Sequence, residues 1–108
     1  MSGSGGGGGG FGVPVGTCES LVIDTQLSSP KEDVIALINV GDVLEVAIET
    51  ADGTSTVVVR HNGAIAGGLA VPLLQRLRQC IEEGTQYSAK VIAKRNALVR
   101  VRVQAIRL

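Results

Sequence analysis

The sequence predicts one small α+β domain, a mostly antiparallel β-sheet or open β-barrel of about six strands with two short helices. Three observations support this fold class. Short apolar or alternating segments recur between turn-forming residues, as in β-rich folds. Two other segments repeat their apolar residues at spacings of three and four, as amphipathic helices do. The chain has 108 residues, which is enough for one hydrophobic core.

Residues 1–17 are expected to form a disordered, glycine-rich tail, and residues 18–108 are expected to form the compact domain. The tail contains six consecutive glycines, and it has too few apolar side chains to offset the entropy cost of ordering it. A natural sequence and an engineered linker would both have this composition, so the origin of the tail stays open.

The domain is expected to begin with a strand followed by a short helix. An apolar cluster of strand type starts at Leu21 and ends at Leu27. Ser29 and Glu32 have the spacing of a capping box, and Pro30 fits the first helical position. The helix should run for about nine residues, to a turn at 39–42. Its buried stripe consists of Val34, Ile35, Leu37 and Ile38.

Three strands of an antiparallel meander are expected next. The first covers 43–50 and alternates apolar with polar side chains. The Asp-Gly pair at 52–53 predicts a hairpin turn to a strand at 54–61. The Asn-Gly pair at 62–63 predicts a second turn, to a short strand at 64–66.

A second helix and two further strands complete the expected domain. The helix should cover 72–83, with proline at its start and Gly84 just beyond its end. The last two strands, 87–94 and 98–106, alternate apolar and polar residues on either side of a turn. The buried stripe of the helix consists of Leu73, Leu74, Leu77, Cys80 and Ile81.

Acidic and basic residues are separated along the chain, although the net charge is zero. Residues 1–59 carry eight acidic side chains and one basic, whereas residues 60–108 carry nine basic and two acidic. One interpretation is a basic face for nucleic acid. The other is that acidic and basic strands lie side by side in one sheet and neutralise each other through cross-strand pairs.

Four basic side chains are the candidate contacts for a nucleic acid or another partner: Lys90, Lys94, Arg100 and Arg102. They would share the outward face of the last two strands if those strands pair, and such a stripe would suit phosphates. Against this interpretation, Phe11 and Tyr87 are the only aromatic side chains on which bases would stack.

A protein-interaction module is the other class of function that the sequence favours. The terminal strand at 98–106 would accept a partner strand or pair with its copy in a homodimer. We therefore expect a non-enzymatic binding or adaptor domain that engages a protein partner, with nucleic-acid binding as the alternative.

Residue types for catalysis and cofactor binding are scarce, and we expect neither an enzyme nor a bound metal or cofactor. His61 is the only conventional base for a nucleophilic serine or cysteine. Glu45 and Glu49 share a strand face but would lie about 13 Å apart, too far for paired catalytic carboxylates. One histidine and two distant cysteines offer no metal-ligand spacing.

The two cysteines also bear on the cellular compartment. Cys80 lies on the apolar stripe of the second helix, and Cys18 lies at the edge of the tail. No signal peptide or membrane span is evident, so we expect a cytoplasmic protein that has no membrane contact and keeps both thiols reduced. A Cys18–Cys80 disulfide is the alternative.

Three segments from Val40 onward carry a resemblance to a known family. Residues 41–46 open a strand, residues 63–67 precede a helix, and residues 84–91 lead into another strand. Together they resemble the HIRAN domain, a small β-barrel of DNA-repair helicases and bacterial proteins, over about half the chain. The resemblance implies a small barrel that binds a DNA 3′ end. HIRAN domains usually carry an Arg and an Asn-containing segment where 49–54 forms a short hairpin here, so no HIRAN site residue is transferred.

Overall fold

A computed structural model gives the structure of the protein and describes residues 17–106. The element order is η1 (Cys18–Ser20), β2 (Val22–Gln26), α1 (Glu32–Ile35), β3 (Val43–Ala51), β4 (Thr54–His61), β5 (Ala64–Gly68), α2 (Leu74–Glu82), β6 (Tyr87–Arg95) and β7 (Leu98–Ala105). The predicted α+β class with an open antiparallel sheet is confirmed. The predicted disordered tail, apart from Thr17, lies outside the described residues.

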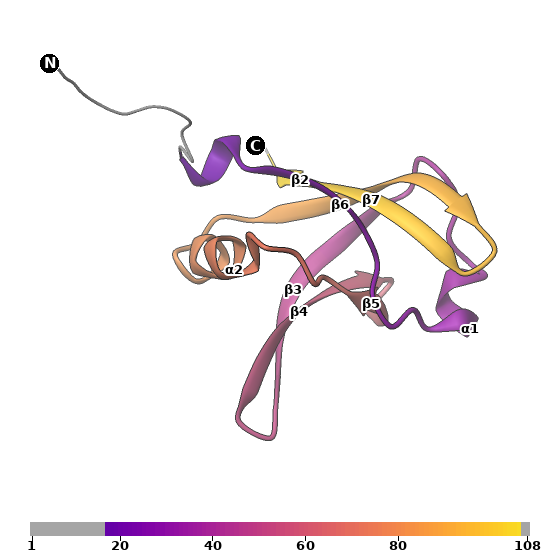
Figure 1. The fold of residues 1–108 in the computed structure, drawn as a ribbon, viewed down its shortest axis with the longest axis horizontal. Helices are drawn as coiled ribbons and strands as arrows, with labels where there is room; N and C mark the ends of the chain where they lie inside the picture. The colour runs from indigo at the N-terminus through magenta and orange to yellow at the C-terminus, as the bar shows by residue number, and fades with distance from the viewer. Residues whose placement is uncertain (1–16, 107–108) are drawn as a thin grey trace, which may run out of the picture.

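One six-stranded antiparallel sheet, in the order β2-β7-β6-β3-β4-β5, forms the body of the domain (Figure 1). The sheet curves but does not close into a barrel. A single isolated bridge between Ser28 and Gly68 joins the chain after β2 to the end of β5. The two edge strands are therefore linked near this bridge without forming a paired ladder.

Buried and exposed side chains alternate strictly along β7, so one face of the strand packs on the core. Val99, Val101 and Val103 are buried, whereas Arg100 and Arg102 between them are exposed. These three β-branched valines belong to the hydrophobic core, and their burial stabilises the fold. Helix α2 adds Leu77 and Cys80 to the same core.

The predicted meander is confirmed, with β3, β4 and β5 paired in sequence. Asp52 and Gly53 have φ values of 52° and 77°, and Asn62 and Gly63 have values of 50° and 86°. Two consecutive residues with positive φ are what a two-residue type I′ hairpin turn requires. The Asp-Gly and Asn-Gly pairs therefore fix both turns.

The first helix is shorter than predicted, and its predicted cap is wrong. Helix α1 has four residues, its N-cap is Lys31, and Ser29 has a φ of 47°. The backbone before the helix is used instead to bridge β5, because Ser28 bonds Gly68 and the Lys31 N–H donates to the Ala66 carbonyl at 2.9 Å. Because the helix ends early, Leu37 is 65% exposed rather than buried.

Helix α2 begins two residues later than predicted but uses the predicted face. Leu77 and Cys80 are fully buried, and Leu73, before the helix, is 45% exposed. Gly84 has a φ of 109° just beyond the last turn, which is the left-handed conformation that glycine adopts readily after a helix. No helix among residues 17–106 is long and apolar enough to cross a membrane.

The β3–β4 hairpin extends beyond its neighbours as an arm, which Figure 1 shows. Strand β6 pairs with β3 only over Val43–Glu45, and β5 pairs with β4 only from Val58 onward. The outer part of the arm, residues 48–57, is therefore a two-stranded ribbon. Arg60 forms an ion pair with Glu49 across the base of this ribbon.

Candidate binding edge

The predicted contact residues on the last two strands are only partly brought together. Lys90 lies opposite Arg102 in the β6–β7 register, and Arg100 is the next residue of β7 on the same face. All three are exposed. The Arg102 guanidinium donates to both carboxylate oxygens of Asp24 on β2, at 2.8 and 2.9 Å. This pair neutralises one of the three positive charges of the stripe.

Lys94, the fourth predicted contact, does not belong to this stripe. A β-bulge between Val91 and Ala93 shifts the register, so Lys94 lies opposite the buried Val99. Its ammonium group donates to the carbonyl of Ile38, just after α1, at 2.7 Å. The expectation that Lys94 faces outward with the others is therefore wrong. It assumed that inward and outward side chains alternate without interruption, and the bulge adds one residue that breaks this alternation.

Within residues 17–106, cross-strand neutralisation, one of the two interpretations of the charge split, is seen at two places. Asp24 and Arg102 are directly opposite in the β2–β7 register. Glu49 and Arg60 form the second pair, between β3 and β4. The hydrogen bond from Arg102 lowers the pKa of Asp24 below its ordinary value of 3.8, and the positive charges of Arg102 and Arg100 add to this effect.

Strand β7 is not an edge strand, so the predicted docking of a partner on residues 98–106 is wrong. It is paired with β2 on one side and with β6 on the other. The sequence could not show that the first strand pairs with the last, because that contact joins residues about eighty positions apart. The exposed edge at this end of the sheet belongs to β2 instead.

The free side of β2 presents backbone groups to solvent. The Leu27 N–H donates to the Val99 carbonyl at 2.9 Å, and hydrogen-bonding residues alternate along an antiparallel strand. Ile23, Thr25 and Leu27 therefore direct their N–H and C=O groups toward β7. Val22, Asp24 and Gln26 direct theirs away, and among residues 17–106 no other strand pairs with this side. We call these outward groups the β2 edge.

The C-terminal end of the β2 edge is held by β5. Ser28 follows the same alternation, and its N–H and C=O both bond Gly68 at 2.8 Å. This close approach depends on glycine at 67, where a Cβ would lie 3.0 Å from the Ser28 carbonyl oxygen. At Gly68 a Cβ would meet the Ser28 hydroxyl, a movable group, at 3.2 Å.

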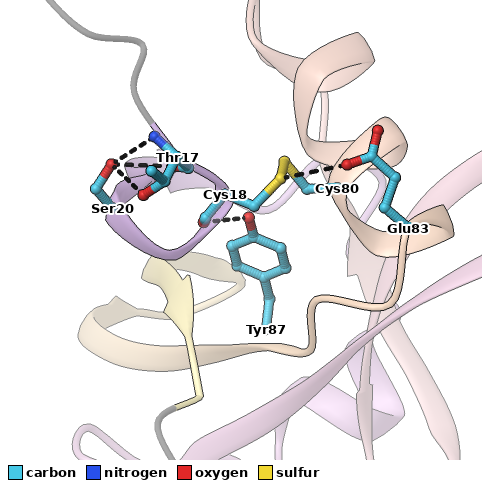
Figure 2. The surroundings of a disulfide bond; sticks show 6 residues. All are labelled: Thr17, Cys18, Ser20, Cys80, Glu83 and Tyr87. Carbon is cyan, nitrogen blue, oxygen red and sulfur yellow. Dashed lines mark hydrogen bonds between the residues drawn. A yellow bond between two sulfur atoms is a disulfide. The ribbon is translucent and has the colours of Figure 1, made fainter.

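The N-terminal end of β2 is held by a disulfide. Cys18 in η1 is bonded to Cys80 in α2, with Cα atoms 5.6 Å apart, so the expectation of two reduced thiols is wrong (Figure 2). The bond encloses a loop with a sequence separation of 62, and loop-closure entropy makes such a cross-link worth roughly 4 kcal/mol. The sequence offered this pairing only as the alternative, because the absence of an evident signal peptide favoured reduced thiols.

Tyr87 supports the same end of β2. Its hydroxyl donates to the Cys18 carbonyl at 2.6 Å from the start of β6, as Figure 2 shows. Burial raises the pKa of Tyr87 above its ordinary value of 10.0. The hydroxyl therefore keeps its proton, and remains a donor, throughout the physiological range.

The residues considered for catalysis lie on the β3–β4 hairpin, and two of them, His61 and Glu49, contact other side chains. His61 ends β4, and its Nε2 atom lies 3.5 Å from the side-chain nitrogen of the neighbouring Asn62. Glu45 and Glu49 lie on one face of β3, and Glu49 pairs with Arg60. Within residues 17–106 no group of three or more His, Cys, Asp or Glu side chains is placed to hold a metal ion.

In comparisons with known proteins, no family model, no curated protein and no solved structure matches the chain. The HIRAN resemblance therefore stays a prediction. The candidate site is defined by geometry alone, as an unpaired strand edge held at both ends.

Proposed function

We propose that the domain is a non-enzymatic binding module that captures an extended segment of a protein partner as an additional strand on the β2 edge. The observation that carries this proposal is the set of three outward backbone positions, Val22, Asp24 and Gln26, on a strand with no second neighbour in the described structure. Main-chain hydrogen bonds give such strand addition its affinity.

Anchoring at both ends favours binding, because a rigid edge loses little entropy when a partner strand pairs with it. The Ser28–Gly68 bridge holds one end of β2, and the disulfide with the Tyr87 hydrogen bond holds the other. The protruding ribbon at 48–57 also has unpaired sides, but a two-stranded ribbon is only marginally stable by itself. We therefore place the partner on β2 rather than on the arm.

A partner of different sequence is favoured over a second copy of this chain. In an antiparallel β2–β2 pair that uses all three outward positions, Asp24 of one copy would lie directly opposite Asp24 of the other. Like charges at directly opposed positions destabilise a strand pair, and the Arg102 partner of each Asp24 reduces this repulsion without removing it. A partner segment with a neutral or basic residue at that position avoids the repulsion.

Nucleic-acid binding is the weaker proposal. Lys90 and Arg100 remain as a short basic pair on the outer face, since Arg102 is engaged by Asp24 and Lys94 lies elsewhere. Two phosphate contacts give weak binding, which falls by only about tenfold between 50 and 200 mM salt. Their contribution would be seen as salt-sensitive oligonucleotide binding that is lost when both residues are changed to glutamate.

The cellular compartment is part of this proposal. Cytoplasmic location was expected from the sequence, whereas disulfides persist mainly in oxidising compartments and are rare in the reducing cytosol. The Cys18–Cys80 bond favours an oxidising compartment, or a cytosolic protein whose disulfide forms and breaks during its work.

To test the β2 edge as a binding site, peptides that bind the domain are selected first, and the outward N–H of Gln26 is then removed by substitution. Random twelve-residue peptides are selected by display against the full oxidised chain, and their affinities are measured for wild type, Gln26→Ala and Gln26→Pro. Proline at an outward edge position removes a donor without disturbing pairing on the other side. We expect Gln26→Ala to bind like wild type and Gln26→Pro to bind about tenfold more weakly.

Thermal unfolding of the three proteins serves as the control for folding. Equal affinity of the selected peptides for wild type and a folded Gln26→Pro variant would place their site elsewhere. Failure to recover any peptide, together with salt-sensitive binding of single-stranded DNA, would favour the nucleic-acid alternative.

A further inference from the structure

The short helix η1 is attached to the domain by few contacts. None of its three residues is fully buried, and Cys18 is only partly exposed because it meets α2 through the disulfide. Beyond the disulfide, η1 meets distant parts of the chain through the hydrogen bond from Tyr87 to the Cys18 carbonyl, through contacts with β7, and through Cys18, which packs against the edge of the core. Its remaining bonds, between Thr17 and Ser20, are local.

The other half of the disulfide belongs to an element that is held independently. Helix α2 buries Leu77 completely and packs Leu74 and Ile81 partly against the core. The core cluster draws buried side chains from every strand and from both α-helices, but none from η1. Opening the disulfide therefore removes an anchor of η1 without removing a core side chain.

We propose that the Cys18–Cys80 disulfide is a redox latch: its reduction by a dithiol releases η1 and the N-terminal end of β2, while the rest of the domain stays folded. The latch would control how rigidly the β2 edge is held. This consequence for binding rests on the proposed function, whereas the release of η1 does not.

The reaction is ordinary thiol–disulfide exchange. Because Cys80 is buried and Cys18 is partly exposed, the thiolate of the dithiol attacks the Cys18 sulfur. The bond between the two cysteines breaks, and its electron pair stays on the Cys80 sulfur, which takes a proton. The second thiol of the reagent then attacks the mixed disulfide, which leaves Cys18 as a thiol and the reagent as a cyclic disulfide.

Glu83 is placed to moderate this exchange. Its Oε1 atom lies 3.9 Å from the Cys18 sulfur, as Figure 2 shows. A carboxylate at that position repels an approaching thiolate and accepts a hydrogen bond from the thiol once it forms. Glu83 therefore slows the attack that opens the latch, and Glu82, one residue earlier and exposed, supplies a matched control.

Amide hydrogen exchange on the full chain, before and after treatment with dithiothreitol, tests the latch. Mass spectrometry after alkylation confirms that both thiols are free. We expect exchange to rise by about tenfold or more at Ser20 and Leu21, whose amides bond the Thr17 and Cys18 carbonyls, and at Ile23, whose amide faces β7. Exchange in β3, β4 and β6 should stay unchanged. Loss of protection throughout the sheet would show a purely structural disulfide, and unchanged exchange at Ser20, Leu21 and Ile23 would show that η1 is held by other contacts. Either result overturns the latch.

Two kinds of variant complete the test. Cys18→Ser leaves Cys80 in the core and should reproduce the exchange pattern of the reduced chain without any reductant. Glu83→Gln should speed reduction by dithiothreitol severalfold, whereas Glu82→Gln should leave the rate near that of wild type; equal rates for the two would remove Glu83 from the mechanism. None of these readouts requires a partner, so they separate failure of the latch from failure of the β2 edge as a binding site.

Discussion

At the scale of single residues, two acidic side chains of the sheet form ion pairs with basic side chains on neighbouring strands. Asp24 and Arg102 form a two-bond pair between the first and last strands, and Glu49 and Arg60 pair between β3 and β4. Each pair joins an acidic residue of the first half to a basic residue of the second. Two of the eight acidic residues in 1–59 are thus neutralised by basic residues of the second half.

The Asp24–Arg102 pair gives an expected pH dependence. The pKa of Asp24 is lowered in the folded chain, so the pair stabilises the fold above about pH 3.8 and loses its effect as the pH falls through the lower folded-state value. Asp24→Asn should therefore unfold at a slightly lower temperature than wild type at pH 7, and the two midpoints should converge in strong acid. Thermal unfolding by circular dichroism at both pH values measures this. A gap that persists in acid would show that the asparagine acts through something other than lost charge.

At the scale of elements, the β-bulge in β6 determines which way the Lys94 side chain points. In β6 the inserted residue between Val91 and Ala93 turns Lys94 toward the end of α1, whereas Lys90 stays on the outer face. Lys94→Met keeps the aliphatic stem but removes the donor to the Ile38 carbonyl. We expect it to lower the free energy of unfolding by about 1–2 kcal/mol, and Lys90→Met by less than about 0.5 kcal/mol. Urea unfolding of both variants measures the difference, and equal losses would argue against the Lys94 contact.

Most elements could be predicted because their signals are local. The turns at Asp52 and Asn62 and the alternation of β7 depend on neighbouring residues, and they are found where expected. The prediction of a helix cap at Ser29 is wrong because the backbone on either side of it bonds β5, which is distant in sequence. The prediction for Lys94 is wrong because the residue types around a bulge do not reveal it. Local sequence patterns indicate where a strand or a turn lies, but they do not indicate which strands pair.

The candidate site arises at the scale of the whole molecule, from contacts far apart in sequence. The pairing of β2 with β7 leaves the opposite side of β2 unpaired, and it brings Cys18 to α2. The sequence contained a hint of this arrangement, since Asp24 on an early strand complements Arg102 on the last. Without the strand order, however, that hint could not be separated from any other acidic and basic pair.

Strand order also explains why the expectation of an edge at residues 98–106 is wrong. A C-terminal strand is a natural candidate for an edge, and 98–106 has the cleanest alternation in the chain. Its burial between β2 and β6 protects it from further pairing. The same pairing makes β2 the edge strand, held by a backbone bridge at one end and a disulfide at the other.

Residue-resolved amide exchange of β2 in the free, oxidised chain tests the central claim most directly. The backbone of Ile23, Thr25 and Leu27 faces β7 and should be protected, whereas the amides of Val22, Asp24 and Gln26 should exchange with solvent much faster. This alternation is expected only if the outward side of β2 is open. Uniform protection along β2 would mean that its edge is already paired, and it would contradict the proposed binding site.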